Sequence, residues 1–397
     1  MLKVSNFQSH LTQKISDLKQ RGTYKSAKHL TTPMQAHAHL QEMESEVCVL
    51  SSNNYLGLAN HPAVVQAAHD ALDKFGLGTA SVRFICGTMS VHQSLEKALA
   101  KFHKTEAALT YSSCWSANTG LFSVICEAGD VLISDALNHA SIIDGCRLVG
   151  KGVVRKVYGH SDMAELESIL KDSENAPRRF VVTDGVFSME GDLANLPEIV
   201  RLCQKYNAVL IVDDSHGVGV MGKAGRGVAE HYNLEDQVDI YTGTLGKALG
   251  GAAGGYVAGS QSLIDMLFQA SRPQIFSNAI SPVTAAGAQA ALELVTADRV
   301  ASLRQKIQHF KKKLHELNIP VLKGESAILP IIIGETSKAI ECSEQLLKKG
   351  FYVTGFGFPV VPEGEARVRI QVSDDLTFDD IDEAAYALND VLKGLVG

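Results

Sequence analysis

Short apolar runs alternate with longer amphipathic stretches through most of the chain, from about residue 60 to residue 285. Each run is bounded by polar residues or glycine, which is typical of short strands buried on both faces. Such strands are predicted at 107–111, 131–134, 180–183, 209–212, 240–242 and 255–258. This alternation of strands and helices predicts an α/β fold with a mainly parallel sheet, covered by helices on both sides.

The two ends of the chain have different patterns. A polar, helix-like arm covers about 5–22, and a short strand pair is predicted near 38–52. After a helical region at about 283–316, three strands are predicted at 327–333, 351–354 and 366–372, with helices at 337–349 and 377–394. We therefore predict three parts: an amino-terminal arm (1–55), a large domain (56–285) and a smaller α+β carboxyl-terminal domain (286–397).

Composition narrows the possible classes of function. The 397 residues carry a formal net charge of −7, so a general affinity for nucleic acid is not expected. No apolar run approaches 18 residues, which argues against a membrane span, and the amino terminus lacks the apolar core of a secretory signal. The seven cysteines form no Cys-x-x-Cys pair, which favours reduced thiols in a cytoplasmic protein. No His/Cys cluster has zinc-ligand spacing, so no metal is predicted.

One lysine stands in an unusual setting, the glycine-rich stretch 242–255, where Lys247 is the sole charged residue. An ammonium group among small apolar residues is poorly solvated, which lowers its pKa and favours the neutral amine that a Schiff-base lysine needs. The glycines would let a flat cofactor and its phosphate approach the backbone. A tight turn before a closely packed helix, with the lysine reaching water, explains the same pattern. The stretch alone leaves both interpretations open.

An acidic pair precedes this lysine by about thirty residues. Asp213 and Asp214 follow the predicted strand 209–212, at the end where open α/β sheets place their ligands. His216 comes three residues after Asp213, so a turn would bring both side chains to one site. Taken alone, an acid at a strand end is more often a helix cap.

Further candidates stand at two predicted helix starts and in one strand. The segment 112–118 would offer free N–H groups to a phosphate, although ordinary capping is the simpler explanation in isolation. His139 lies at another strand-to-helix junction, where it would stack on a cofactor ring or serve in packing. Arg369, in the last predicted strand, would bind a carboxylate through its two-pronged guanidinium or face water. Arg367 is expected on the opposite side of that strand.

Two motifs point to other functions but are weaker. The sequence Gly217-Val-Gly-Val-Met-Gly222 matches the dinucleotide-binding pattern, yet four polar residues separate it from its strand and no helix is predicted directly after it. The Gly-Lys pair at 246–247 is typical of phosphate loops, but the glycine spacing is too short and Ala248 stands where a magnesium-binding Ser or Thr is needed. Neither motif outweighs the Schiff-base interpretation.

A strand-end aspartate followed by a lysine resembles the arrangement of pyridoxal-phosphate enzymes, in which the acid keeps the pyridine nitrogen protonated and the lysine forms an imine with the cofactor. Further runs make the resemblance specific over nearly the whole chain: 53–62 (NNYLGLANHP), 80–88 (ASVRFICGT), 133–145, 183–189, 212–216 (VDDSH), 243–251 (GTLGKALGG) and 351–356. With these runs the sequence resembles the α-oxoamine synthases, which condense an amino acid with an acyl-coenzyme A.

The resemblance implies a fold-type I transferase, pyridoxal 5′-phosphate as cofactor and a homodimer with shared active sites. It assigns the imine and removal of the α-proton to Lys247, and the pyridine nitrogen to Asp213. The remaining implied roles are stacking on the ring by His139, hydrogen bonding of the ring's phenolic oxygen by His216 and Ser188, phosphate binding by Ser113, Cys114 and Thr244 together with Ser277 of the partner subunit, and binding of the substrate or product carboxylate by Asn53 and Arg369.

Within the family, the resemblance favours the glycine C-acetyltransferases of threonine breakdown, which join glycine and acetyl-coenzyme A into 2-amino-3-oxobutyrate. Sister enzymes that take alanine with pimeloyl-, serine with palmitoyl- or glycine with succinyl-coenzyme A stay open. Trp115 and Ser116 stand where phenylalanine and an acidic residue are expected, so the sequence does not fix the shape of the acyl end. A non-catalytic subunit would lack Lys247, and a dehydrogenase would depend on the weak glycine motif alone.

Overall fold

A seven-stranded sheet, hereafter the central sheet, organises the molecule in the strand order β3-β9-β8-β7-β6-β4-β5. The computed structural model describes residues 2–24, 26–358 and 360–396. The strands of the central sheet are β3 (Ala107–Tyr111), β4 (Val131–Asp135), β5 (Val154–Tyr158), β6 (Arg179–Asp184), β7 (Val209–Asp213), β8 (Ile240–Thr244) and β9 (Gly255–Gly259). Strands β8 through β5 run parallel, whereas β9 is antiparallel to both β8 and β3. The predicted α/β fold with a mainly parallel sheet is confirmed.

Both faces of the central sheet are buried. Leu210 and Val212 of β7 belong to one hydrophobic cluster, while Ile211 between them belongs to another. Because successive side chains of a strand point to opposite faces, this division means that apolar side chains cover each side of the sheet. The sequence pattern does not predict β5, which lies at the sheet edge, where Arg155 and Lys156 are exposed and interrupt its apolar residues.

Helices connect and cover the strands of the central sheet. They are α2 (Pro62–Phe75), α3 (Ser90–His103), α4 (Cys114–Ile125), α5 (Ala140–Arg147), α6 (Met163–Asp172), α7 (Leu196–Tyr206), α8 (Val228–His231), α9 (Gln261–Ala270), α10 (Arg272–Phe276) and α11 (Pro282–Glu293), with the π-helical turn η1 (Arg83–Gly87) and the 3₁₀ turn η2 (Glu235–Gln237). α7 illustrates the local logic. Proline lies in its first turn, Ile199 and Cys203 are buried four residues apart, and Asn207 ends it in the left-handed region.

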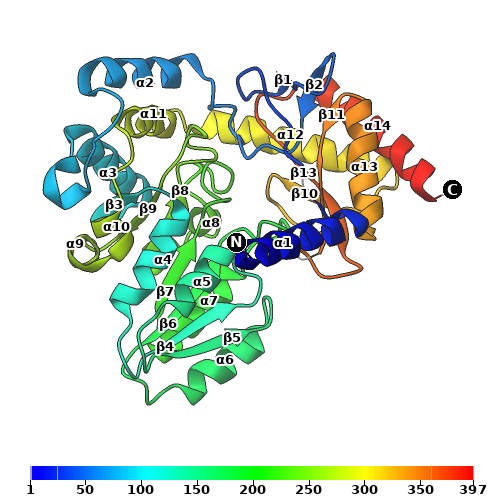
Figure 1. Ribbon diagram of the computed structural model, residues 1–397. Coiled ribbons are helices and arrows are strands. Elements are labelled where there is room, and N and C mark those ends of the chain that lie inside the picture. Colours follow the sequence, from blue (N-terminus) through cyan, green and yellow to red (C-terminus); the bar gives the residue numbers. More distant parts are fainter. Residues whose placement is uncertain (1, 25, 359, 397) are drawn as a thin grey trace.

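Two three-stranded sheets, hereafter the terminal sheets, combine both ends of the chain. One has the order β1-β2-β11 and the other β10-β13-β12. Their strands are β1 (His37–His39), β2 (Glu46–Val49), β10 (Ile328–Gly334), β11 (Phe351–Tyr352), β12 (Thr354–Phe356) and β13 (Ala366–Gln371), accompanied by α1 (Leu2–Gln20), α12 (Ala297–Glu316), α13 (Thr336–Lys348) and α14 (Phe378–Val396). Figure 1 shows α12 extending from beside α11 toward α14. In the same view α1 is blue and α14 is red, because they come from opposite ends of the chain. Among the described residues, no helix is long and apolar enough to cross a membrane.

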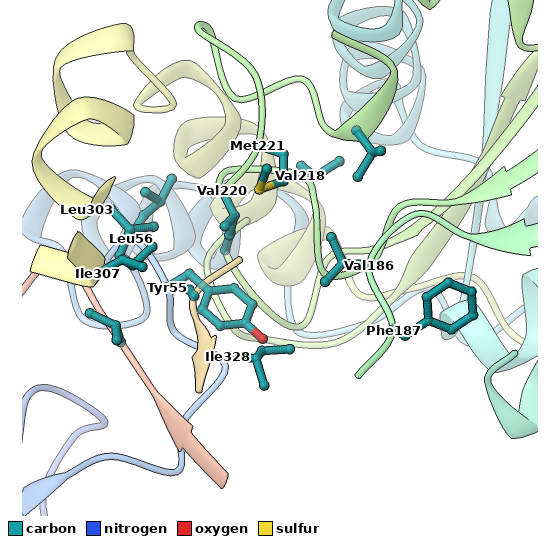
Figure 2. Close-up of a cluster of buried hydrophobic side chains, with 14 of the residues drawn as sticks. Tyr55, Leu56, Val186, Phe187, Val218, Val220, Met221, Leu303, Ile307 and Ile328 are labelled. Carbon is teal, nitrogen blue, oxygen red and sulfur yellow. The ribbon is translucent and has the colours of Figure 1, made fainter. Parts of the chain in front are cut away.

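A cluster of buried hydrophobic side chains packs between the terminal sheets and the central sheet. Figure 2 shows side chains from distant segments meeting there: Tyr55, Leu56, Val186, Val218, Val220, Met221, Leu303, Ile307 and Ile328. Val218, Val220 and Met221 lie in the turns that follow β7, while Ile328 opens β10. This packing places β13, the partner of β10, beside the carboxyl ends of the central strands.

Candidate active site

Lys247 lies in the turn that follows β8 and faces an internal cavity. Burial lowers the pKa of its ammonium group, against the opposing charges of Asp213, Cys114 and Asp184. Gly250 and Gly251 follow at φ angles of 91° and 66°, in the left-handed region that favours glycine. The poorly solvated amine expected from the sequence is therefore present, at the carboxyl end of a central strand.

The two adjacent aspartates point to different surroundings. Asp213 Oδ2 accepts a hydrogen bond of 2.6 Å from Asn118 Nδ2, and its Oδ1 accepts one of 3.0 Å from the backbone N–H of Ser215. Asp214 Oδ2 instead accepts the backbone N–H of Val228 at 2.7 Å, where it caps α8. Desolvation raises the pKa of Asp214 to about 7. Asp213 therefore lines the cavity, whereas Asp214 fixes a turn.

The turn around Asp214 needs glycine. Gly227 has a φ of 104°, and a Cβ there would lie 1.8 Å from Asp214 Oδ2. The glycines after Asp213 and Asp214 thus serve close packing around a buried carboxyl group. Val228 opens only a four-residue helix, which is too short for the helix that a dinucleotide-binding motif requires.

The start of α4 lies against the lysine turn. Ser113 caps this helix, with its Oγ accepting the N–H of Ser116 at 3.0 Å. Ser113 also forms a bridge with Gly254, and a Cβ on Gly255 would lie 2.2 Å from the backbone nitrogen of Cys114. Glycine at 255 therefore lets β9 approach the helix start. The unpaired N–H groups of the first turn provide positive potential at this edge of the cavity.

Two histidines with lowered pKa line the cavity. His139 caps α5, its Nδ1 accepting the backbone N–H of Ser141 at 3.2 Å, and burial lowers its pKa. His216 is 9% exposed, and its Nδ1 lies 2.7 Å from the hydroxyl of Tyr55. Burial, followed by the charges of Lys247 and Arg369, holds the pKa of His216 well below its usual range. Both shifts favour the neutral form of the imidazole.

The cavity has a volume of about 240 Å³. It brings together most of the site residues expected from the sequence: Ser113, Cys114, His139, Ser188, Asp213, His216, Thr244 and Lys247. Within the described part of the chain, three expected residues lie outside its lining: Asn53, Ser277 and Arg369. The cavity also contains residues that were not assigned a role, including Trp115, Ser141, Asp184 and Ser215.

Comparisons with known proteins support one family. Residues 45–388 match the family model described as aminotransferase class I and II. The chain is 44% identical to an 8-amino-7-oxononanoate synthase of Thermoanaerobacter pseudethanolicus over 97% of both chains. It is also 44% identical to a 2-amino-3-ketobutyrate coenzyme A ligase of Salmonella typhimurium over 98% of both. A serine palmitoyltransferase from S. paucimobilis, solved with a bound PLP–myriocin aldimine, matches with a TM-score of 0.91 at 28% identity, covering 99% of each chain.

The chain belongs to the α-oxoamine synthases. It is a fold-type I enzyme that condenses an amino acid with an acyl-coenzyme A, and its cofactor is pyridoxal 5′-phosphate. The cavity of this synthase fits that cofactor, because it combines a buried amine, a buried carboxylate and the start of a helix. The close approach allowed by glycine at 255 keeps the helix start next to the lysine turn.

Arg369 and Arg367 correct one prediction about this synthase. Both side chains reach the same turn: Arg369 donates to the carbonyl of Ser188 at 2.6 Å, and Arg367 donates to the carbonyl of Met189 at 3.0 Å. Residues two apart in a strand share a face, so the expectation that Arg367 lies opposite Arg369 is wrong. Arg367 is 1% exposed and forms an ion pair of 3.2 Å with Glu190.

Arg369 sits at the border of the cavity. It is 8% exposed, its Nε has no hydrogen-bond partner among the described residues, and its guanidinium lies 4.7 Å from the centre of the Phe356 ring. Burial lowers its pKa, while Tyr55 and Glu190 oppose that effect. A buried cation with an unpaired donor is a suitable partner for an anion.

Asn53 and Ser277 occupy different positions. Asn53 Oδ1 lies 3.4 Å from the hydroxyl of Tyr55, which contacts His216, so Asn53 belongs to the surroundings of the site. Ser277 directly follows the short helix α10. Phe276, at the end of this helix, is 69% exposed.

Several residues that support the site were not assigned a role from the sequence. Asn118 contacts Asp213 and lies one helical turn after Cys114, so helical periodicity along α4 was the available signal. Tyr55 and Gln371 meet although 316 positions separate them, and no local pattern predicts that contact. Asp184 pairs in register with Asp213 on the neighbouring strand, which the strand-end rule alone would have indicated.

Proposed function

We propose that this synthase condenses glycine with acetyl-coenzyme A, giving 2-amino-3-oxobutyrate and coenzyme A, and that it runs reversibly. The observation that carries this choice is the bulky side chain of Trp115 in the lining of the cavity. Trp115 lies edge-on to His139, with the ring centres 6.2 Å apart. A large indole beside the ring that would cover the cofactor narrows the space for substrates, which suits a small amino acid and a short acyl group.

Pyridoxal phosphate, when bound, supplies an aldehyde that bonds reversibly to amines and a ring that draws electrons from the amino acid's α-carbon. Lys247 is the amine that would hold it. Asp213, fixed by Asn118 and Ser215, would keep the ring nitrogen protonated. Ser113, Cys114 and Thr244 would bind the phosphate at the start of α4. His139 would cover one face of the ring, with His216 and Ser188 beside its hydroxyl.

The remaining steps concern protons and position. Arg369 and Asn53 would bind the glycine carboxylate, which orients the α-hydrogen toward Lys247. Once the amino group of glycine has replaced it on the cofactor, the freed Lys247 amine would remove that proton, because burial lowers its pKa and leaves a neutral fraction. The α-carbon then bonds to the thioester carbonyl, the carbon–sulfur bond breaks, and coenzyme A leaves as the thiol after taking a proton. Every atom of the two substrates is thereby accounted for.

A second candidate function is the condensation of alanine with pimeloyl-coenzyme A. The observation that favours it is the equal identity, 44%, to an 8-amino-7-oxononanoate synthase and to a 2-amino-3-ketobutyrate coenzyme A ligase. The serine- and succinyl-dependent members of the family remain lesser alternatives. The free state of the seven cysteines supports a reducing, cytoplasmic location as part of the same proposal.

A coenzyme A release assay tests the proposal. Glycine, alanine and serine are each paired with acetyl-, succinyl-, pimeloyl- and palmitoyl-coenzyme A, and kcat/KM is compared. Glycine with acetyl-coenzyme A should give the highest value, and Trp115→Ala should shift the ratio toward pimeloyl-coenzyme A. A wild-type enzyme that prefers alanine with pimeloyl-coenzyme A would instead establish the second candidate.

We also propose that the synthase is a homodimer in which Ser277 contacts the cofactor phosphate of the partner subunit. Exposed apolar side chains support an interface here: Phe84 and Ile85 of η1 are 55% and 67% exposed. A bridge between Val82 and Asn278 brings this turn beside the end of α10. Apolar groups gathered at the surface are typical of contact sites.

A mixed dimer tests whether the sites are shared. One chain carries Lys247→Ala and the other Ser277→Trp, after each homodimer has been found inactive. With shared sites, one of the two sites in the mixed dimer receives both defects and the other receives neither, so activity should return. A verified mixed dimer without activity would mean that Ser277 serves its own chain.

A further inference from the structure

The position of the His216 ring does not by itself show which of its two nitrogens carries the proton. That choice decides whether the ring presents a hydrogen-bond donor or an acceptor to the cavity. A neutral imidazole has one nitrogen that donates and one that accepts. His216 Nδ1 contacts the Tyr55 hydroxyl at 2.7 Å, whereas Nε2 has no partner among the described residues. The state of His216 therefore depends on which way the proton lies between Nδ1 and Tyr55.

The amide of Gln371 has a fixed orientation. Its Nε2 donates to the backbone carbonyl of Ser51 at 2.6 Å, and its Oε1 lies 2.9 Å from the Tyr55 hydroxyl. Turning the amide over would place two acceptor oxygens 2.6 Å apart, because a carbonyl has no proton to give. Gln371 is 1% exposed, so water does not compensate for such a reversal.

Tyr55 has a single hydroxyl proton to give. Gln371 Oε1 at 2.9 Å and Asn53 Oδ1 at 3.4 Å can both only accept, so the proton of Tyr55 points away from His216 and toward these oxygens, of which Gln371 Oε1 is the nearer. The short contact with His216 must then be an N–H donation from Nδ1 to the tyrosine oxygen. Tyr55 is fully buried and burial raises its pKa, so the hydroxyl stays protonated. Figure 2 shows its ring among Leu56, Val220 and Ile328, with apolar side chains around it.

We propose that Gln371 is a positioning residue that acts through Tyr55 to keep the His216 proton on Nδ1, so that Nε2 presents its lone pair to the cavity. His139 has the opposite arrangement. Its Nδ1 accepts the backbone N–H of Ser141 at 3.2 Å and lies 2.7 Å from Ser141 Oγ, a hydroxyl that already accepts from Asn118 Nδ2 and can give its own proton to Nδ1. The proton of the neutral ring is therefore on Nε2. One cavity therefore contains a histidine that accepts at Nε2 and a histidine that donates at Nε2.

The consequence for chemistry rests on the proposed function. If the ring hydroxyl of the cofactor lies beside His216, the hydroxyl must donate the hydrogen bond, because Nε2 has no proton. Lys247 and Arg369 are the charged groups that face His216, and both disfavour its protonation. His216 would thus accept a hydrogen bond from the ring hydroxyl and would not donate one.

Nitrogen NMR of the holoenzyme tests this directly. The protein is labelled with ¹⁵N-histidine, and long-range proton–nitrogen correlations report which ring nitrogen carries hydrogen; the His216→Gln variant identifies the signals. We expect wild-type His216 to carry its proton on Nδ1, and His139 to carry it on Nε2. A wild-type His216 protonated at Nε2 would overturn the proposal without any substitution.

Two variants separate a positioning role from simple packing. Gln371→Leu removes the nearer acceptor and leaves Asn53 Oδ1, 3.4 Å away, as the weaker competitor for the Tyr55 proton. The hydroxyl can then donate to His216 Nδ1, which should move the His216 proton toward Nε2. Tyr55→Phe should allow at least partial protonation of Nε2. His139 signals should stay unchanged, as they should in Gln345→Leu, a matched change on α13. Unchanged His216 signals in a folded Gln371→Leu protein would refute the role of Gln371. These readouts involve no acyl donor, so they stand or fall independently of the coenzyme A release assay.

Discussion

The carboxyl ends of the central strands and strand β13 contribute residues to the site in different ways. The central strands contribute residues at or just beyond their carboxyl ends, such as Asp184, Asp213 and Lys247. β13 contributes alternate residues from within a strand: Arg367, Arg369 and Gln371. The first region carries the ionisable groups that lie in the cavity, whereas the second reaches the cavity only through contacts with its rim.

This difference indicates a division of tasks. Arg369 and Arg367 hold the backbone carbonyls of Ser188 and Met189, and Gln371 contacts Tyr55. Substitutions at the central strand ends should therefore abolish chemistry while leaving the fold intact. Substitutions along β13 should alter substrate affinity, proton position or stability, depending on which contact is lost.

The largest effect is expected at Lys247. Lys247→Ala removes the amine that lines the cavity, so coenzyme A release should fall by at least about 10⁴-fold. The thermal unfolding temperature should change little. Lys223→Ala, an exposed lysine, serves as the control and should keep full activity. Borohydride reduction that attached the cofactor to a different lysine would contradict the assignment.

The adjacent aspartates give the next contrast. Asp213→Asn keeps the shape but loses the charge beside the cofactor ring, so kcat should fall by about 10²- to 10⁴-fold. Asp214→Asn should cost less than about threefold, because desolvation raises the pKa of this carboxyl to about 7 and an amide oxygen still accepts the N–H of Val228. Steady-state kinetics compare the two. Equal losses would mean that both carboxylates act on the cofactor.

On β13, the two arginines should separate affinity from stability. Arg369→Lys should raise the KM for glycine about tenfold and Arg369→Ala about 100-fold, the range expected for charge-assisted hydrogen bonds. Arg367→Ala should instead lower the free energy of unfolding by about 1–3 kcal/mol, since Glu190 and the carbonyl of Met189 lose their partner. Urea unfolding and glycine titrations measure both. A KM that rose equally in Arg367→Ala would contradict this division.

The two regions also differ in how far the sequence predicts them. Apolar runs and the strand-end rule located the central strands and the residues of the cavity, because strand, turn and site residue are neighbours in sequence. The edge strand β5 was missed, since Arg155 and Lys156 face solvent and leave little apolar signal.

The contribution of β13 depends on tertiary contacts. Neither the pairing of Gln371 with Tyr55 nor the contact of Arg369 with Ser188 has a local signature, because 316 and 181 positions separate the partners. Arg367 was misplaced for a simpler reason, since positions two apart share one face of a strand. The roles given to Ser277 and Asn53 come from the family resemblance and remain predictions.

The smallest effect is expected at a charged bridge whose members do not line the cavity. His160 bridges Asp135, its Nδ1 3.1 Å from Oδ1, and Asp192, its Nε2 2.9 Å from Oδ2. Burial alone would lower the pKa of His160, but hydrogen bonds and charges from both aspartates outweigh it and raise the pKa to about 10. The ordinary value is about 6.5.

His160→Gln should therefore lower the free energy of unfolding by about 1 kcal/mol at pH 6. The folded state holds the proton more tightly than the unfolded state, so the contribution is complete below about pH 6.5 and declines as pH rises through about 10. Urea unfolding at pH 6, 8 and 10 should show the difference between wild type and variant shrinking at each step. His69→Gln, exposed on α2, should show no such trend. The kcat of His160→Gln should equal that of the wild type, because this bridge lies outside the cavity lining. A loss of unfolding free energy that grew with pH would mean that the two aspartates do not hold the imidazolium.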